Sequence, residues 1–216
     1  MIDINCDMGE IEELLMDNTY SNLMDHVTSI NIACGGHAGD KEMMQKIVQI
    51  AKRKKVKIGA HPSYPDRKNF GRYELKIDPQ ELSDSIAKQI NDLIDIADSE
   101  NITIDHIKPH GALYNKAAKN KELATLICDT VKKINPDLPI MCLAESPMVS
   151  VIEKLGMKAK LELLPMQLGD VEESNANIDE TVENFNYRPK TSVKEGISNF
   201  VDWYLDNQDT LEKNGI

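Results

Sequence analysis

The sequence predicts an α/β fold in which about five strand–helix units build a parallel sheet with helical crossovers. Short apolar segments alternate five times with segments of helical periodicity, a pattern typical of parallel strands joined by helices. The alternation stops after about residue 160, where the composition changes. We therefore expect an α/β domain of residues 1–160 and a mostly helical tail of residues 161–216.

Each element follows from a local pattern. The expected strands are the short β-branched or apolar segments 2–6, 28–34, 56–60, 102–108 and 138–144. Helical spacing of apolar residues predicts helices over 41–54, 78–97, 120–134, 146–155 and 192–206, with a short helix at 179–185. The clearest helix start is Asp78, an N-cap residue followed by Pro79 at the first helical position. Ser192 and Glu195 form a capping box for the tail helix, whose apolar stripe we expect to be packed.

The composition limits the kinds of partner that we expect the protein to bind. The 216 residues carry a net charge of −11 and no long basic run, which argues against a nucleic-acid or membrane partner. The N-terminus lacks the basic flank and apolar core of a signal peptide, and no segment has the roughly 20 apolar residues that span a bilayer. The four cysteines are far apart in the sequence, so we expect reduced thiols in a cytoplasmic protein.

Three turns share one design, in which an apolar strand ends and a histidine follows beside glycine or proline. They are "NIACGGHAGD" with His37, "KIGAHPSYPD" with His61 and "HIKPHGALYN" with His110. In parallel sheets the carboxyl ends of the strands lie at one edge, where ligands bind. We therefore expect these histidines to converge on one pocket with Asp7 of "DMGE". His106 lacks this setting and is expected to be a satisfied core residue.

The residues at this edge divide into expected catalytic and expected substrate-binding groups. The catalytic group comprises Asp7, His37, His61, Lys108 and His110. The substrate-binding group comprises Asn5, Glu10, Asp40, Asp66, Arg72, Tyr114 and Asn115. Asp7, His61 and His110 could hold Zn²⁺ with an open position, or they could perform acid/base catalysis without a metal. Asp40 has the alternative role of a helix cap, and Arg72 that of a surface residue.

Several motifs together resemble one known family. "DINCDMGE", "NIACGGHAGD", "GAHPSYPD", "FGRY" and "HIKPHGALYN" resemble, in order over about residues 1–155, the motifs of the 5-oxoprolinase A-subunit family, also called the LamB/YcsF lactam-utilization family. The resemblance implies a (β/α) barrel of the polysaccharide-deacetylase type, here incomplete. It also implies ATP-dependent hydrolytic opening of the cyclic amide 5-oxoproline to glutamate, with partner subunits B and C supplying the ATP chemistry. The family's usual "GFGRR" is "NFGRY" here, which changes Asn69 and Tyr73.

The tail resembles a different group. Residues 161–206, with the segment "NFVDWY", resemble the C-terminal end of nucleotide-sugar epimerases of the UDP-glucuronate type. The Gly-rich dinucleotide loop and the YxxxK motif of such enzymes are missing, so neither NAD binding nor epimerase activity is expected. The further βα units of the LamB/YcsF family are missing as well. The alternative to a 5-oxoprolinase component is therefore a truncated, fused protein without activity, in which a second copy could cover the open sheet edge.

Overall fold

The computed structural model describes residues 3–162 and 190–213. The chain divides into two units, Met1–Pro165 and Met166–Ile216. This division falls five residues beyond the one expected from the sequence, at residue 160, and the epimerase-like character of the tail stays a prediction. The short helix expected at 179–185 lies outside the described residues.

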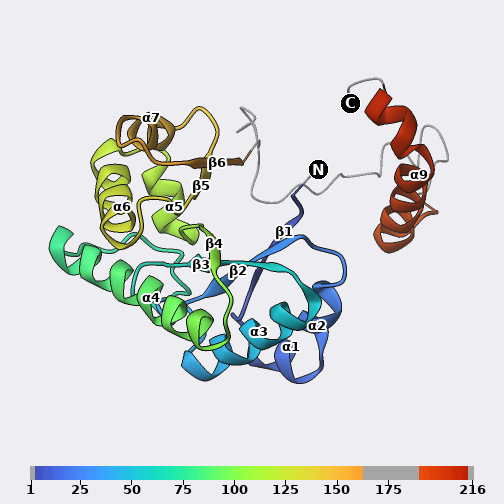
Figure 1. Ribbon diagram of the computed structural model, residues 1–216, viewed down its shortest axis with the longest axis horizontal. Coiled ribbons are helices and arrows are strands. Elements are labelled where there is room, and N and C mark those ends of the chain that lie inside the picture. The colour runs from blue at the N-terminus through green and yellow to red at the C-terminus, as the bar shows by residue number, and fades with distance from the viewer. Residues whose placement is uncertain (1–2, 163–189, 214–216) are drawn as a thin grey trace, which may run out of the picture. The chain divides into compact units, whose positions relative to one another are not determined.

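The first unit is built on a six-stranded parallel sheet, which confirms the predicted α/β class (Figure 1). Its strands are β1 (Asn5–Met8), β2 (Ser29–Ala33), β3 (Lys57–His61), β4 (Ile104–Ile107), β5 (Ile140–Leu143) and β6 (Ala159–Glu162). They lie side by side in chain order, as successive strands of a (β/α) barrel do. Of the described strands, β1 and β6 form the two edges.

Strand β6 was not predicted, because two of its four residues are charged. Lys160 Nζ lies 2.5 Å from Asp3 Oδ2 and 3.2 Å from Asp105 Oδ2, while Lys57 Nζ pairs with Asp105 Oδ1 at 3.0 Å. Lys160 thereby links the last strand to the segment that precedes the first. Charged residues such as Lys160, which forms ion pairs across the sheet, interrupt the apolar pattern by which strands are recognised in a sequence.

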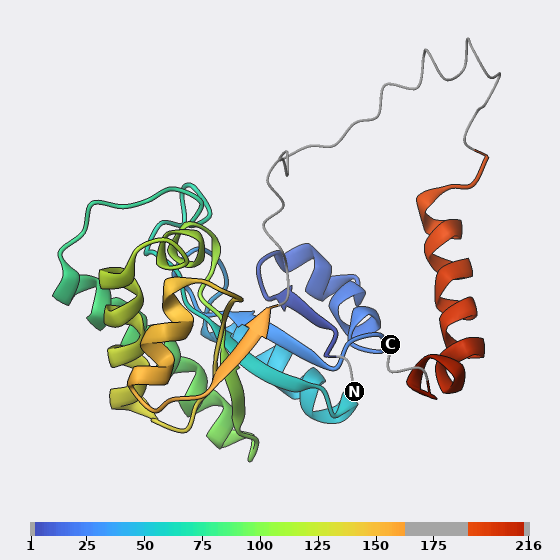
Figure 2. The ribbon, with the colours of Figure 1, turned by 90° about the horizontal axis from the view of Figure 1, so that it is seen from above.

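The helices of the first unit follow the strands around one side of the sheet (Figure 1). They are α1 (Glu12–Met16), α2 (Thr19–Leu23), α3 (Lys41–Lys54), α4 (Pro79–Ser99), α5 (Gly111–Ala117), α6 (Lys121–Ile134) and α7 (Pro147–Lys154). Helix α3 packs on α4, α4 on α6, and α6 on α7. The turned view shows α7 beside β6 (Figure 2). The short helices α1, α2 and α5 were not predicted, because they span too few residues to show a periodicity.

The two faces of the sheet differ in polarity. Ile30, Ile32, Ile58 and Ile107 alternate with polar residues along their strands and are buried against the apolar faces of the helices. The opposite face carries buried polar side chains, among which Asn31 and His106 are fully buried. The expectation that His106 is a satisfied core residue is confirmed, since its imidazole contacts both Asn31 and Asp105.

In the second unit the structure describes helix α9 (Val193–Lys213). Its start is capped as expected, with the Glu195 backbone N–H donating to Ser192 Oγ at 3.2 Å. The apolar stripe was expected to be packed, but Ile197, Phe200 and Leu205 are each more than half exposed. Among the described helices, none is long and apolar enough to cross a membrane.

The burial of His106 predicts a pH dependence of folding. Burial, together with the charge on Lys160, lowers the pKa of His106 to about 4. The unfolded chain, with an ordinary histidine pKa of about 6.5, therefore binds more protons than the folded chain between these values, and stability falls as the pH falls through this window.

We expect wild type to lose about 3 kcal/mol more than His106→Gln in the free energy of unfolding between pH 7 and pH 4. Urea denaturation at several pH values measures the difference. His26→Gln is the matched control, since His26 is exposed, and it should keep the wild-type dependence. Parallel curves for wild type and His106→Gln would contradict the prediction.

Candidate functional site

The structure brings together the three histidines of the predicted turns. The rings of His37 and His110 are stacked, with centroids 3.6 Å apart and planes 3° from parallel. The ring of His61 stands edge-on to both, with its centroid 4.8 Å from that of His110 and 5.5 Å from that of His37. All three residues are buried, and they come from the carboxyl ends of β2, β3 and β4.

Close packing of the loops depends on glycine. Gly71 has a φ of +64°, and a Cβ there would lie 2.9 Å from His37 Cβ and 3.0 Å from His110 Cδ2. Any larger residue would therefore push the stacked rings out of place. Gly71 belongs to the "FGRY" motif, whose glycine is retained where the family pattern changes on either side.

Three residues that the sequence did not single out hold the loops. Arg67 Nη1 donates to the carbonyl oxygens of Gly35 and Gly39, on either side of His37. Gln89 pairs through its amide with the backbone N–H and C=O of Ser63, two residues after His61. The Tyr20 hydroxyl accepts from the backbone N–H of Glu10 at 3.1 Å. Single polar residues on helices or in turns carry no local signal of such long-range contacts.

Backbone carbonyls determine the tautomers of two histidines. His61 Nδ1 lies 2.6 Å from the Lys108 carbonyl oxygen, and His110 Nε2 lies 2.9 Å from that of Phe70. A carbonyl oxygen only accepts, so both ring nitrogens carry protons. The remaining nitrogens, His61 Nε2 and His110 Nδ1, then face each other at 2.9 Å with a lone pair each. Two lone pairs at this distance repel each other unless a shared proton or a cation lies between the nitrogens.

Two carboxylates border the histidines. Glu10 Oε1 lies 3.0 Å from His37 Nε2 and 3.6 Å from His110 Nδ1. Asp7 Oδ2 lies 3.5 Å from His61 Nε2, and Asp7 Oδ1 lies 3.2 Å from Lys108 Nζ. The expected catalytic group, Asp7 with the three histidines and Lys108, is thus one spatial cluster.

The cluster keeps its acids ionised and two of its histidines neutral. Burial raises the pKa of Asp7, but contacts with His61 and the charge on Lys108 outweigh it and hold that pKa well below its usual range. Burial likewise raises the pKa of Glu10, and His37 more than offsets this. Burial lowers the pKa of His37, and burial with the neighbouring histidines lowers that of His110 to about 4. Neutral imidazoles suit metal binding and proton acceptance.

One group of side chains fits a metal ion. Glu10, His37, His61 and His110 each offer one ligand atom, and these four atoms lie within 4.8 Å of one another. The predicted metal set was Asp7, His61 and His110. The group instead includes Glu10 and His37, with Asp7 beside it at His61. Metal-binding histidines commonly donate their second nitrogen to a backbone carbonyl, as His61 and His110 do here. His37 Nδ1 is buried and has no hydrogen-bond partner among the described residues.

The other predicted site residues lie outside the cluster. Asp40 is exposed and caps α3 by accepting from the Met43 backbone N–H at 2.8 Å, which is the alternative role considered for it. Asp66 accepts from the Asn69 side chain and backbone.

Arg72 is exposed, with its guanidinium over the Phe70 ring, which itself contacts His37 and His110. Tyr114 is half-buried and Asn115 exposed on α5. Asn5 lies in the sheet, bonded to Ser29.

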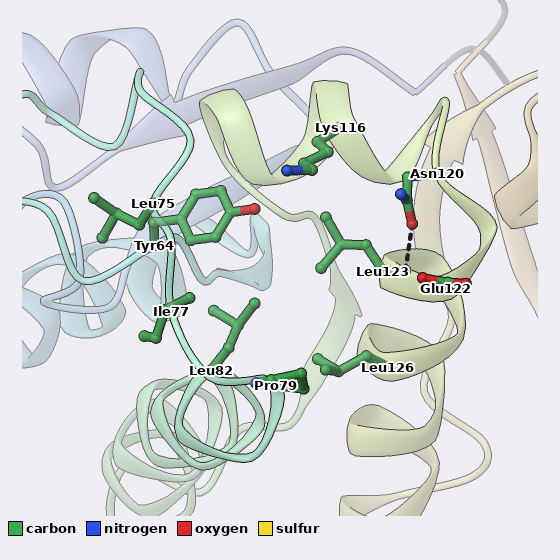
Figure 3. Close-up of a pocket in the computed structure, with 10 residues that line it drawn as sticks. All are labelled: Tyr64, Leu75, Ile77, Pro79, Leu82, Lys116, Asn120, Glu122, Leu123 and Leu126. Atoms are coloured by element: carbon green, nitrogen blue, oxygen red, sulfur yellow. Dashed lines mark hydrogen bonds between the residues drawn. The ribbon is translucent and has the colours of Figure 1, made fainter.

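A separate crevice of about 230 Å³ lies between the start of α4 and helices α5 and α6 (Figure 3). It is lined by Tyr64, Leu75, Ile77, Pro79, Leu82, Lys116, Asn120, Glu122, Leu123 and Leu126. None of these residues belongs to the histidine cluster. The crevice and the cluster are therefore distinct features of the first unit.

Comparisons with known proteins identify relatives of the first unit. A profile of the LamB/YcsF family matches residues 2–165. The chain is 43% identical over 162 residues to the 5-oxoprolinase A subunit of Bacillus licheniformis, and 41% identical over 162 residues to that of Bacillus subtilis. These alignments cover 75% of this chain and 64% and 63% of the relatives. The chain thus spans less than two-thirds of their length.

A solved structure gives the same result. The lactam utilization protein from Thermus thermophilus is 33% identical, with a TM-score of 0.67 over 74% of this chain and 65% of that one. The comparisons give no support to the epimerase-like resemblance of the tail, and the family match ends at residue 165. Motifs, fold and matched residues agree over the first unit, and the chain belongs to the LamB/YcsF family.

Proposed function

We propose that this chain acts as the A-type component of a 5-oxoprolinase, which opens the cyclic amide of 5-oxoproline by hydrolysis to give glutamate. One observation carries the proposal: an ionised carboxylate, a histidine lone pair and an ammonium group meet where β1, β3 and β4 end. Asp7 Oδ2 lies 3.5 Å from His61 Nε2, and Asp7 Oδ1 lies 3.2 Å from Lys108 Nζ. The relatives named as 5-oxoprolinase A subunits support the choice of substrate.

The cluster holds the groups that hydrolysis of an amide requires. A base must take a proton from the attacking water, and an acid must protonate the nitrogen when the ring C–N bond breaks. The Nε2 lone pair of His61 is placed to accept the first proton, and the Asp7 carboxylate would stabilise the imidazolium that forms. The protonated ring would then return this proton to the nitrogen as the C–N bond breaks. Lys108 supplies a cation for the carbonyl oxygen, on which negative charge develops during the attack. Arg72, at the exposed side of Phe70, is a candidate for holding the substrate carboxylate.

Partners and a metal complete the proposal. ATP would act through partner subunits B and C, as the family resemblance implies. Glu10, His37, His61 and His110 would hold a divalent ion, because their ligand atoms converge and the second nitrogens of two histidines are bound to carbonyls. Such an ion supplies Lewis-acid polarisation of a carbonyl and lowers the pKa of bound water. His61 Nε2 can serve as a base or as a ligand, and metal content separates these roles.

Activity is tested by reconstitution. The purified chain should release glutamate from 5-oxoproline and ATP when mixed with subunits B and C, and each partner alone should not. Asp7→Asn should lower kcat at least about 100-fold, because it removes the negative charge that would stabilise protonated His61.

His26→Gln, a change at an exposed histidine, is the control and should match wild type. An Asp7→Asn variant within about threefold of wild type would contradict the role given to Asp7. A well-folded wild type without turnover would favour the non-catalytic alternative instead.

Metal content separates the two candidate ligand sets. Elemental analysis after incubation with Zn²⁺, Co²⁺ or Mn²⁺ should find about one ion per chain. His37→Ala should reduce this occupancy strongly, because His37 belongs to the converging group. Asp7→Asn should leave it largely unchanged, because Asp7 stands beside that group. Loss of metal in Asp7→Asn but not in His37→Ala would instead support the set predicted from the sequence. A wild type that turns over without metal would show acid/base catalysis alone.

A further inference from the structure

Four residues form one row across the polar face of the sheet. Asp7 of β1 pairs in register with Asn31 of β2, Asn31 with Gly59 of β3, and Gly59 with His106 of β4. Residues in register point to the same face of a sheet. The row therefore leads from a fully buried histidine to the carboxylate at the catalytic cluster.

Glycine in the third place lets His106 reach across a whole strand. His106 Nε2 lies 2.6 Å from Asn31 Oδ1, although these residues belong to strands that are not neighbours. A Cβ at Gly59 would lie 2.4 Å from His106 Nε2 and 2.6 Å from the adjoining ring carbons. The φ of Gly59 lies outside the left-handed region, so the glycine is required for space alone.

The Asn31 amide uses its full hydrogen-bonding capacity. Its Nδ2 donates to Asp7 Oδ1 at 2.6 Å and to Asn5 Oδ1. Its Oδ1 accepts from Asn5 Nδ2 at 3.3 Å and faces His106 Nε2. An amide has two donor hydrogens and two acceptor sites, so all four positions are occupied.

The direction of this chain of bonds is set at Asp7. An ionised carboxylate only accepts, so the NH₂ group of Asn31 must face it, and the amide oxygen must face His106. His106 must then donate from Nε2. Burial lowers the pKa of His106 to about 4, so at neutral pH the ring carries a single proton. This proton can lie on Nδ1 or on Nε2.

The contact on the other side of the ring is the longer of the two that compete for this proton. His106 Nδ1 lies 3.2 Å from Asp105 Oδ2. That carboxylate is already bound by Lys57 at 3.0 Å and by Lys160 at 3.2 Å. The charge of Asp105 is thus compensated by two cations, and the shorter contact of the ring, 2.6 Å from Nε2 to Asn31 Oδ1, favours the proton on Nε2.

We propose that Asn31 and His106 are positioning residues, which hold the Asp7 carboxylate toward His61 and Lys108, and that Gly59 provides the space through which His106 acts. The relevance to catalysis rests on the role proposed above for Asp7. Neither Asn31 nor His106 touches the substrate in this scheme. His106 orients the Asn31 amide, and the Asn31 NH₂ group then fixes the rotamer of Asp7.

The first test needs neither substrate nor partner. Nitrogen-15 NMR of the imidazole in the isolated chain at pH 7 identifies the tautomer of His106 from its ring nitrogen shifts and ring-proton couplings. The expected result is a neutral ring with the proton on Nε2. A proton on Nδ1 would overturn the proposal, because His106 could not then donate to Asn31.

The second test uses two substitutions that place an amide at different ends of the ring. The amide of His106→Gln reaches the position of Nε2 and can donate to Asn31, whereas that of His106→Asn reaches only the position of Nδ1. We expect His106→Gln to keep kcat within about threefold, and His106→Asn and Gly59→Ala to lower kcat by roughly ten- to a hundredfold. KM should change less than about twofold in each, since no group that contacts substrate is removed.

Stability and structure separate positioning from a merely structural role. Urea denaturation of each variant shows how much folded protein is present, and kcat is corrected for it. Equal kcat in His106→Gln and His106→Asn after this correction would overturn the proposal. If wild type with its partners shows no turnover, the proposed function fails but this inference does not. A crystal structure of His106→Asn then decides it, because Asp7 should rotate away from His61, and an unchanged Asp7 would overturn the proposal.

Discussion

The arrangement of the site depends on one partly buried hydrogen bond, from Asn31 Nδ2 to Asp7 Oδ1. A partly buried carboxylate is stable in its charged form only where donors and cations compensate for lost water. Asn31, His61 and Lys108 provide this compensation from three different strands or strand ends. The row of residues that supplies Asn31 runs through the sheet, so the position of the carboxylate depends on the register of β1 to β4. Sheet pairing and chemistry are therefore coupled in this molecule.

The histidine cluster shows how close packing restricts chemistry. Gly71 and the glycine loop around His37 bring backbone and rings into contact, and two carbonyl oxygens select the ring nitrogens that remain available. These nitrogens then face each other with a lone pair each, an arrangement that repels unless a proton or cation lies between them. The same packing favours neutral histidines, because burial disfavours the charged ring. The cluster is thus suited to binding a cation and to accepting protons.

A group of ion pairs near the amino-terminal ends of the strands links parts of the sheet. Lys160 joins Asp3 and Asp105, and Lys57 also pairs with Asp105, so β6 is linked to β4 and to the segment before β1. Removing one partner of such a group leaves the other charge without compensation, which destabilises the fold by more than the intact pair stabilises it. Asp105 is also the residue that borders His106, so this ionic group and the polar row meet at β4.

The sequence by itself determined the α/β class, the family, five of the strands, and the three histidine turns with Asp7 at one edge. These follow from local periodicity and from the rule that parallel strands end on the same side. It did not reveal β6, whose charges mask its pattern, or the short helices α1, α2 and α5. Nor did it separate Asp40, a helix cap, from Glu10, which joins the histidines. Only the tertiary structure placed Tyr20, Arg67, Gln89 and His106 against the site, because their roles are contacts between residues distant in sequence. Such contacts leave no periodic trace in the chain, and the space above Gly59 exists only once three strands are paired.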